Sequence, residues 1–182
     1  MGDDHVPFRP IPLIVTDPVP SYIFPSCAPY DSKNQWILPP EQQKTMSDIH
    51  TDIEHAFGLE VYYTVSLRQK PPPSINATSW WFPLKGGPNS CVPPEQIQKV
   101  CDKIIAHCPS VFVVHCTHGL NRTLLILAAL YLTFNTDRTV EDALHKVRQI
   151  RPPGILRTNV VDALRGWHQQ RALKCRHHAR KK

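Results

Sequence analysis

The sequence lacks an apolar run that could span a bilayer, because its longest one, Leu124–Leu132, is far shorter than the roughly 20 residues a membrane helix requires. A charged start followed by an apolar stretch is also absent, so the sequence predicts no signal peptide and an intracellular protein without a membrane partner. The six cysteines show no CxxC spacing, which argues against a zinc site and favours reduced thiols. With 182 residues, of which 41% are hydrophobic, the chain is expected to build one sizeable core.

Positive charge is concentrated at one end of the chain. The 21 Lys and Arg residues exceed the 15 Asp and Glu residues by six, and residues 171–182 hold six basic residues and no acidic one. The remainder is therefore formally neutral. We predict a basic C-terminal tail over residues 171–182, which acts either as a solubilising end or by attracting RNA, and which favours the nucleus over the cytoplasm.

Proline is concentrated at the other end. Nine of the 19 prolines lie in residues 1–40, which disfavours regular helix there. We predict an extended N-terminal arm over these residues, wrapped on the surface, with one short strand near Leu13–Val15. Residues 41–170 are expected to form the single domain.

Strand and helix patterns alternate through that domain. Val111–Val114 is wholly apolar, as expected for a strand buried on both faces of a mainly parallel sheet. The alternation predicts an α/β fold with a central, mostly parallel sheet flanked by helices. Periodicity and capping residues predict strands over Leu59–Leu67 and Trp80–Leu84, and helices over Ser47–Phe57, Pro94–Cys108, Arg122–Phe134, Thr139–Val147 and Asn159–Leu173.

The segment HCTHGLNRT, His115–Thr123, directly follows the apolar strand. The five residues between Cys116 and Arg122 are enough to curl backbone amides around one phosphate at a strand-to-helix turn, and such amides stabilise a thiolate. We predict that Cys116 is the nucleophile and that Arg122 clamps the phosphate. The predicted phosphate-binding residues are Thr117, His118, Gly119, Leu120, Asn121 and Arg122.

Two further residues of this segment have predicted supporting roles. Thr123 can hydrogen-bond the sulfur and help it leave when water cleaves a phosphocysteine intermediate. His115 is interpreted as an organiser whose ring faces away from the phosphate and hydrogen-bonds the loop backbone. A lone cysteine after a buried strand is usually a packed thiol, but His, Cys, Arg and Thr at these fixed offsets seldom coincide by chance. The sequence therefore favours a cysteine-dependent phosphatase that needs no metal or other cofactor.

The pattern His115-Cys-x5-Arg-Thr123 resembles the signature of the cysteine phosphatase superfamily. The fuller string is similar to the RNA 5′-triphosphatase branch, which includes the triphosphatase domain of mRNA capping enzymes. RPPGI at Arg151–Ile155 resembles a segment that follows the central helices in that branch, and Lys85-Gly86 stands where the branch has a Lys-Gly loop. The resemblance covers residues from about 58 to 170.

This resemblance implies a dual-specificity phosphatase-like fold. It implies metal-independent removal of the terminal phosphate from triphosphate-ended RNA, so that the RNA 5′ end is the partner. Lys85, Arg151 and Arg157 would contact further phosphates. The chain has no Lys-x-Asp-Gly nucleotidyltransferase motif, so capping would require a separate guanylyltransferase.

A missing carboxylate agrees with that substrate. Protein phosphatases of this superfamily usually place an aspartate upstream of the cysteine to protonate a poor leaving group. Between Val61 and Val100 the only acid is Glu95, at the start of a predicted helix. Because a diphosphate is a far weaker base than an alkoxide, an RNA triphosphatase can lack the acid with less penalty.

Two other readings stay open on the sequence. One is a dual-specificity protein phosphatase. The other is a non-catalytic module that binds phosphorylated or triphosphate ends, since Leu124 stands where the family has Gly and Tyr62-Tyr63 stands where it often has Asp.

Overall fold

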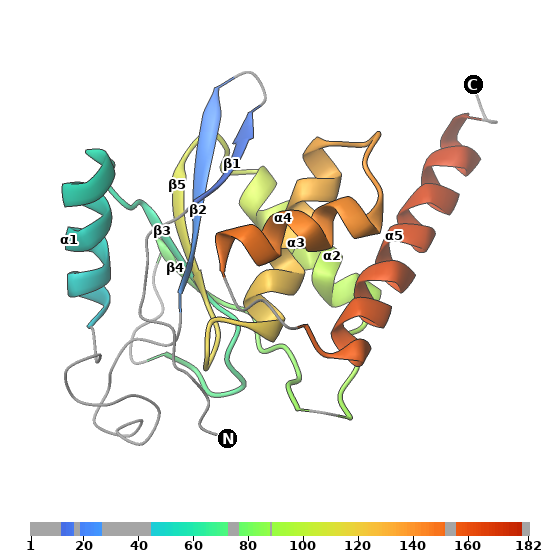
Figure 1. Ribbon diagram of the computed structural model, residues 1–182, viewed down its shortest axis with the longest axis horizontal. Coiled ribbons are helices and arrows are strands. Elements are labelled where there is room, and N and C mark those ends of the chain that lie inside the picture. Colours follow the sequence, from blue (N-terminus) through green and yellow to red (C-terminus); the bar gives the residue numbers. More distant parts are fainter. Residues whose placement is uncertain are drawn as a thin grey trace.

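In the computed structural model of the chain, a five-stranded sheet lies between helices on both faces (Figure 1). The structure describes residues 12–16, 19–26, 45–72, 77–87, 89–151 and 156–179. The strands are β1 (Leu13–Thr16), β2 (Pro20–Ser26), β3 (Tyr63–Ser66), β4 (Ser79–Trp81) and β5 (Val111–His115). Their order is β1-β2-β5-β3-β4, and every pairing is parallel except that of β1 with β2. The predicted α/β class with a mostly parallel sheet is confirmed.

All five predicted helices are present. They are α1 (Met46–Phe57), α2 (Pro94–Ile105), α3 (Asn121–Phe134), α4 (Val140–Ile150) and α5 (Thr158–Ala179). Figure 1 shows α1 on one face of the sheet and the other four on the opposite face. Among the described residues, no helix is both long and apolar enough to cross a membrane.

The central strand β5 separates two apolar cores. Phe112 and Val114 pack into the large core beneath α2 to α5, whereas Val111 and Val113 pack into a smaller core with residues of α1. Successive strand side chains point to opposite faces, so an all-apolar strand serves both cores at once. The prediction of a strand buried on both faces is confirmed.

The prediction of a surface arm is wrong for the part of residues 1–40 that the structure describes. The short strand near Leu13–Val15 exists as β1, but the chain then turns into β2, which lies between β1 and β5 inside the sheet. Ile23 and Phe24 of β2 are fully buried on opposite sides of the sheet. The remaining residues of the predicted arm lie outside the described ones.

Two helix starts carry capping boxes, one of them at a different residue from the predicted one. Thr45, rather than Ser47, caps α1, because its hydroxyl accepts from the Asp48 amide and the Asp48 carboxylate accepts from the Thr45 amide. The capping pair predicted at Thr139 is confirmed at the start of α4.

The last helix also extends past its predicted end and into the predicted basic tail. Arg171 belongs to α5, and its guanidinium donates to the carbonyl oxygens of Leu132 at 3.1 Å and Thr133 at 3.5 Å near the end of α3. Cationic groups at a helix C-terminus satisfy carbonyls that the helix leaves without partners. Arg171 is therefore anchored to the body, while residues 180–182 of the predicted tail lie outside the described ones.

We expect Leu124→Ala to lower the free energy of unfolding by about 2–5 kcal/mol, because Leu124 is fully buried in the large core and truncation leaves a cavity. Urea unfolding followed by circular dichroism measures the change. Leu173→Ala is the matched control, since Leu173 is 57% exposed and its truncation is expected to cost no more than about 0.5 kcal/mol. Equal losses for the two variants would contradict a core role for Leu124.

Candidate active site

The predicted phosphate loop lies where β5 ends and α3 begins. His115 is the last residue of β5, Cys116 follows it, and Asn121 opens α3. Gly119 has a φ of 66°, in the left-handed region that glycine adopts without a Cβ penalty. The chain therefore turns from the central strand into a buried helix over residues 117–120, the arrangement in which backbone amides bind anions.

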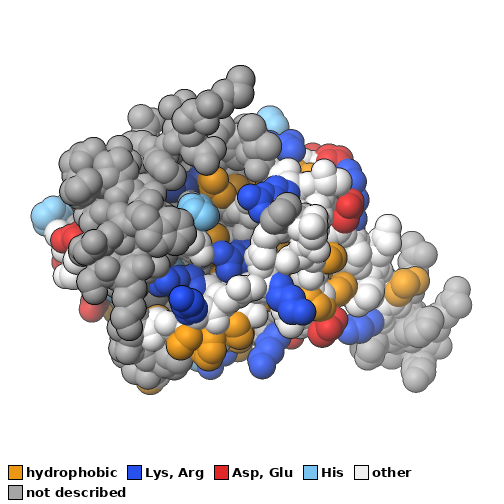
Figure 2. All heavy atoms as spheres, turned by 90° about the horizontal axis from the view of Figure 1, so that it is seen from below, with side chains coloured by type: hydrophobic (Ala, Val, Ile, Leu, Met, Phe, Trp, Pro, Cys, Tyr) orange, Lys and Arg blue, Asp and Glu red, His pale blue; other side chains and the backbone are white. Residues whose placement is uncertain are grey.

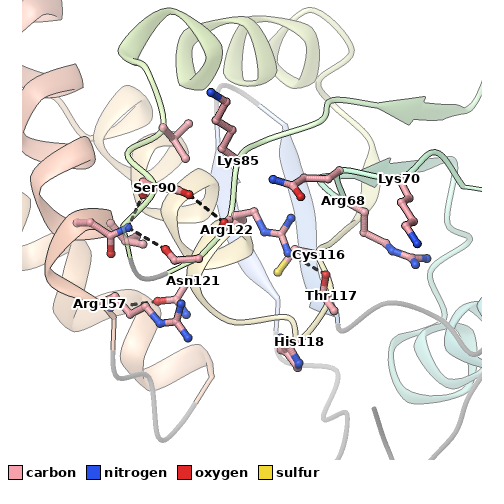
Figure 3. Close-up of a pocket in the computed structure, with 16 residues that line it drawn as sticks. Arg68, Lys70, Lys85, Ser90, Cys116, Thr117, His118, Asn121, Arg122 and Arg157 are labelled. Carbon is pink, nitrogen blue, oxygen red and sulfur yellow. Dashed lines mark hydrogen bonds between the residues drawn. The ribbon is translucent and has the colours of Figure 1, made fainter. Parts of the chain in front are cut away.

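A cavity of about 500 Å³ has Cys116 in its wall. The residue is only 3% exposed, and Figure 3 shows its sulfur surrounded by the other lining residues. Seven of the predicted site residues line this cavity: Lys85, Cys116, Thr117, His118, Asn121, Arg122 and Arg157.

Five cationic side chains line the cavity, and among the described residues no Asp or Glu does. Figure 3 shows Arg157 on one side of Cys116 and Arg68 with Lys70 on the other. At the end of the molecule where the cavity lies, Lys and Arg side chains gather in the middle of the face and acidic ones lie toward its edges (Figure 2). A concave site lined by one sign of charge attracts ligands that carry several charges of the opposite sign. The five are Arg68, Lys70, Lys85, Arg122 and Arg157.

The guanidinium of Arg122 is held by three hydrogen bonds. Nη1 donates to the carbonyl oxygens of Leu67 at 3.1 Å and Leu84 at 3.3 Å, and Nη2 donates to Oγ1 of Thr117 at 2.8 Å. An arginine carries five N–H groups. The two that these bonds leave are on Nε and Nη2, and two N–H groups on neighbouring nitrogens match two oxygens of one phosphate.

The predicted phosphate loop, or signature loop, is also joined by a hydrogen bond to the start of α5. The Oδ1 atom of Asn121 accepts from the backbone N–H of Arg157 at 3.1 Å. Arg157 lines the cavity, and its side chain comes from the residue just before α5. The hydrogen bond therefore positions one of the five cations against the loop.

The hydroxyl of Thr123 is fully buried, but it makes no hydrogen bond to the Cys116 sulfur. Thr123 is 0% exposed, and its Oγ1 has no hydrogen-bond partner among the described residues. The structure thus places Thr123 beneath the loop without the thiol contact that the sequence predicts.

His115 is also buried, and the predicted hydrogen bond from its ring to the loop backbone is not found. Its Nδ1 atom has no hydrogen-bond partner among the described residues. Burial, with a further contribution from the positive charge of Arg68, lowers the pKa of His115 to about 3. The imidazole is therefore neutral at physiological pH, so it adds no charge beneath the loop.

Two predicted phosphate contacts differ in how well their positions fit that role. Lys85 lines the cavity, although Figure 3 shows its ammonium directed away from the Cys116 sulfur. Arg151 is 5% exposed and does not line the cavity, so its position does not support a phosphate contact. Residues 152–155, which complete the RPPGI segment, lie outside the described ones.

Nine lining residues were not among the predicted site residues, and five of them contact other site residues or carry charge. Arg68 and Lys70 belong to a stretch whose positive charge is visible in the sequence, which is the one signal that pointed to them. Gly86 lies against the Arg122 guanidinium, because a Cβ on it would be 3.1 Å from Cζ of Arg122. Ser90 and Asn159 carry no sequence signal, since their role depends on contacts between distant segments.

We expect Gly86→Ala to weaken the binding of inorganic phosphate at least about tenfold. The new Cβ would be 3.1 Å from Cζ and 3.2 Å from Nε of Arg122, closer than the ordinary carbon contact of about 3.5–4.0 Å, so the guanidinium must move. Titration calorimetry measures the affinity. Gly166→Ala is the control, because a Cβ there meets no atom within 4 Å, and it should bind phosphate like the wild type. Unchanged affinity in Gly86→Ala would contradict a tightly held Arg122.

We also expect stability to fall as the pH is lowered from about 6.5 toward 3, because His115 is neutral in the folded protein and takes up a proton on unfolding. His115 should contribute up to about 1.4 kcal/mol per pH unit to this fall, and His115→Asn should reduce the slope by that amount. The rest comes from groups such as His50, whose pKa burial also lowers. Urea unfolding at several pH values is the measurement. His145→Asn, at an exposed position, should keep the slope; an undiminished slope in His115→Asn would contradict the assignment.

Comparison with known proteins links the chain to phosphatases. No protein-family model matches it. In sequence, 71 residues (38% of this chain) are 37% identical to an mRNA-capping enzyme of Danio rerio, and a match of the same length is 34% identical to the mRNA-capping enzyme of Mus musculus. Each match covers 12% of the relative's length, so the chain corresponds to a small part of these enzymes.

Solved structures give the fold. The kinase associated phosphatase aligns with a TM-score of 0.62 at 10% identity, covering 93% of this chain and 98% of that one. DUSP15 aligns with a TM-score of 0.57 at 20% identity over 75% and 88% of the two chains, and human DUSP28 with 0.56 at 15% identity over 90% and 99%. The chain therefore has the fold of these phosphatases, and over 71 residues it resembles the mRNA-capping enzymes in sequence.

Proposed function

We propose that this protein is a metal-independent RNA 5′-triphosphatase that removes the terminal phosphate of triphosphate-ended RNA. The observation that carries the proposal is the composition of the cavity around Cys116, which has five cationic side chains and, among the described residues, no carboxylate. A 5′-triphosphate carries several negative charges within a few bond lengths, so it complements this cavity better than a single phosphoryl group does. The sequence similarity to mRNA-capping enzymes supports the same substrate.

The lack of a carboxylate also suits the leaving group. In the first step the Cys116 thiolate attacks the terminal phosphorus, an S–P bond forms, and the bond from that phosphorus to the bridging oxygen breaks. The diphosphate end departs with the electron pair and needs no proton from the protein, because a diphosphate is a weak base. In the second step water attacks the phosphocysteine, inorganic phosphate is released, and the thiolate returns.

The residues of the loop take the following parts in these steps. The Nε and Nη2 groups of Arg122 donate to two oxygens of the transferred phosphate, where charge redistributes in the transition state. Backbone amides of residues 117–120 donate to the same group. Arg68, Lys70 and Arg157 lie on either side of Cys116 and are placed to offset the charge of the other two phosphates.

A second candidate is a dual-specificity protein phosphatase, which the solved structures of similar fold favour. This activity would require a group that protonates the alkoxide or phenoxide leaving group. Phosphate release from phosphotyrosine peptides at a rate equal to release from triphosphate RNA would favour the protein phosphatase. In the RNA case, a separate guanylyltransferase would act on the diphosphate product.

The proposal is tested with RNA whose terminal phosphate is labelled. We expect the wild type to release label in the presence of EDTA and Cys116→Ser to release none, because serine is not ionised at neutral pH and cannot act as the nucleophile. Cys101→Ser is the matched control, since Cys101 is buried in the large core and burial raises the pKa of its thiol.

Three outcomes separate the alternatives. Release that requires a divalent metal would contradict the proposed mechanism, and so would release that persists in Cys116→Ser. RNA binding without turnover in the wild type would favour the non-catalytic module. Normal release by Cys101→Ser would show that the loss in Cys116→Ser is specific to Cys116.

A further inference from the structure

Asn159, in the first turn of α5, joins this helix to Gly87 and Ser90, which also line the cavity. Its Nδ2 group donates to the carbonyl oxygen of Gly87 at 3.2 Å and to that of Ser90. The two partners precede it by 72 and 69 residues in the sequence, so the bonds connect segments that are not neighbours along the chain. Asn159 itself is half-buried and lines the cavity.

The segment to which Asn159 donates also contacts the side chain of Arg122. The hydroxyl of Ser90 donates to the carbonyl oxygen of Gly86 at 2.9 Å. Gly86 packs on the guanidinium of Arg122, and Leu84 shortly before it accepts from Nη1 at 3.3 Å. A displacement of Ser90 and Gly86 would therefore move a surface that the guanidinium contacts.

The start of the same helix is also bonded to the signature loop, because the Arg157 amide donates to Asn121. Figure 3 shows Ser90, Asn121 and Arg157 on the same side of Cys116. The start of α5 thus makes hydrogen bonds both to Gly87 and Ser90 and to the signature loop.

We propose that Asn159 is a positioning residue for Arg122, acting through Ser90 and Gly86. An arginine held in one plane gives two aligned donors to an oxyanion, and a mobile one must lose side-chain entropy on each binding event. The proposal rests on the phosphate-clamping role of Arg122 within the proposed function, but not on RNA as the substrate.

The test measures binding of inorganic tungstate, a phosphate-like oxyanion, by titration calorimetry. We expect Asn159→Leu, which keeps the size of the side chain but removes its donors, to weaken tungstate binding about five- to tenfold. Asn135→Leu is the matched control, because the Asn135 amide also donates to a backbone carbonyl, that of Tyr131 at 2.9 Å, at the end of α3 away from the cavity. It should bind tungstate like the wild type.

A double-variant cycle separates positioning of Arg122 from general loosening of the fold. In an Arg122→Lys background, where the planar fork is absent, Asn159→Leu should produce no further loss of tungstate affinity. Equal fold losses in the two backgrounds would overturn the proposal, and so would wild-type affinity in the single variant. Ser90→Ala, which breaks the same path with a smaller change, should weaken binding in the same direction and serves if Asn159→Leu unfolds. Because tungstate contains no RNA, a protein that shows this coupling but does not hydrolyse triphosphate RNA would refute the substrate and leave the positioning role intact.

Discussion

The site depends on the fixed plane of one guanidinium group. Arg122 reaches from the start of α3 to donate to the carbonyl oxygens of Leu67 and Leu84, and it also donates to the Thr117 hydroxyl oxygen in its own loop. Its partners therefore lie after β3, after β4 and after β5, so three strand ends are joined by one side chain. A charged group with three of its donors used by the protein cannot rotate freely. The same three hydrogen bonds thus tie three strand ends together and hold the guanidinium in place.

The electrostatics of the site follow from what surrounds that group. The cavity wall concentrates positive charge, which is unfavourable without a ligand. His115 adds no further charge, because burial and the nearby Arg68 lower its pKa and keep the imidazole neutral. A protonated imidazole beneath the loop would add to the charge, but its removal from water makes protonation costly. The ligand itself is left to neutralise the remaining charge, so recognition by such a cavity depends on how many negative charges the substrate brings.

The sequence predicts the position of the loop between strand and helix better than the surroundings that hold it. The segment His115–Thr123 and its flanking strand and helix are contiguous, so spacing and periodicity are enough to place them. The interior strand β2 was missed because Pro20 and Pro25 argue against a central strand, yet Pro25 pairs in register with Val114. Asn159 was missed for another reason: its partners lie 72 and 69 residues away, and no local pattern marks a contact at that separation.

Two residues, Leu124 and Tyr62, depart from the family pattern, and their positions indicate what each departure affects. Leu124 is fully buried in the large core and does not line the cavity, so a side chain at this position fills space beneath the loop rather than space a phosphate would occupy. Tyr62, in the pair that stands where the family often has Asp, is 56% exposed just before β3. Leu124 therefore gives no steric reason to favour a non-catalytic module, and only the departure at Tyr62 still supports it. The separate lack of an upstream general acid weighs against a protein phosphatase more than against an RNA triphosphatase, because a diphosphate leaves without a proton donor.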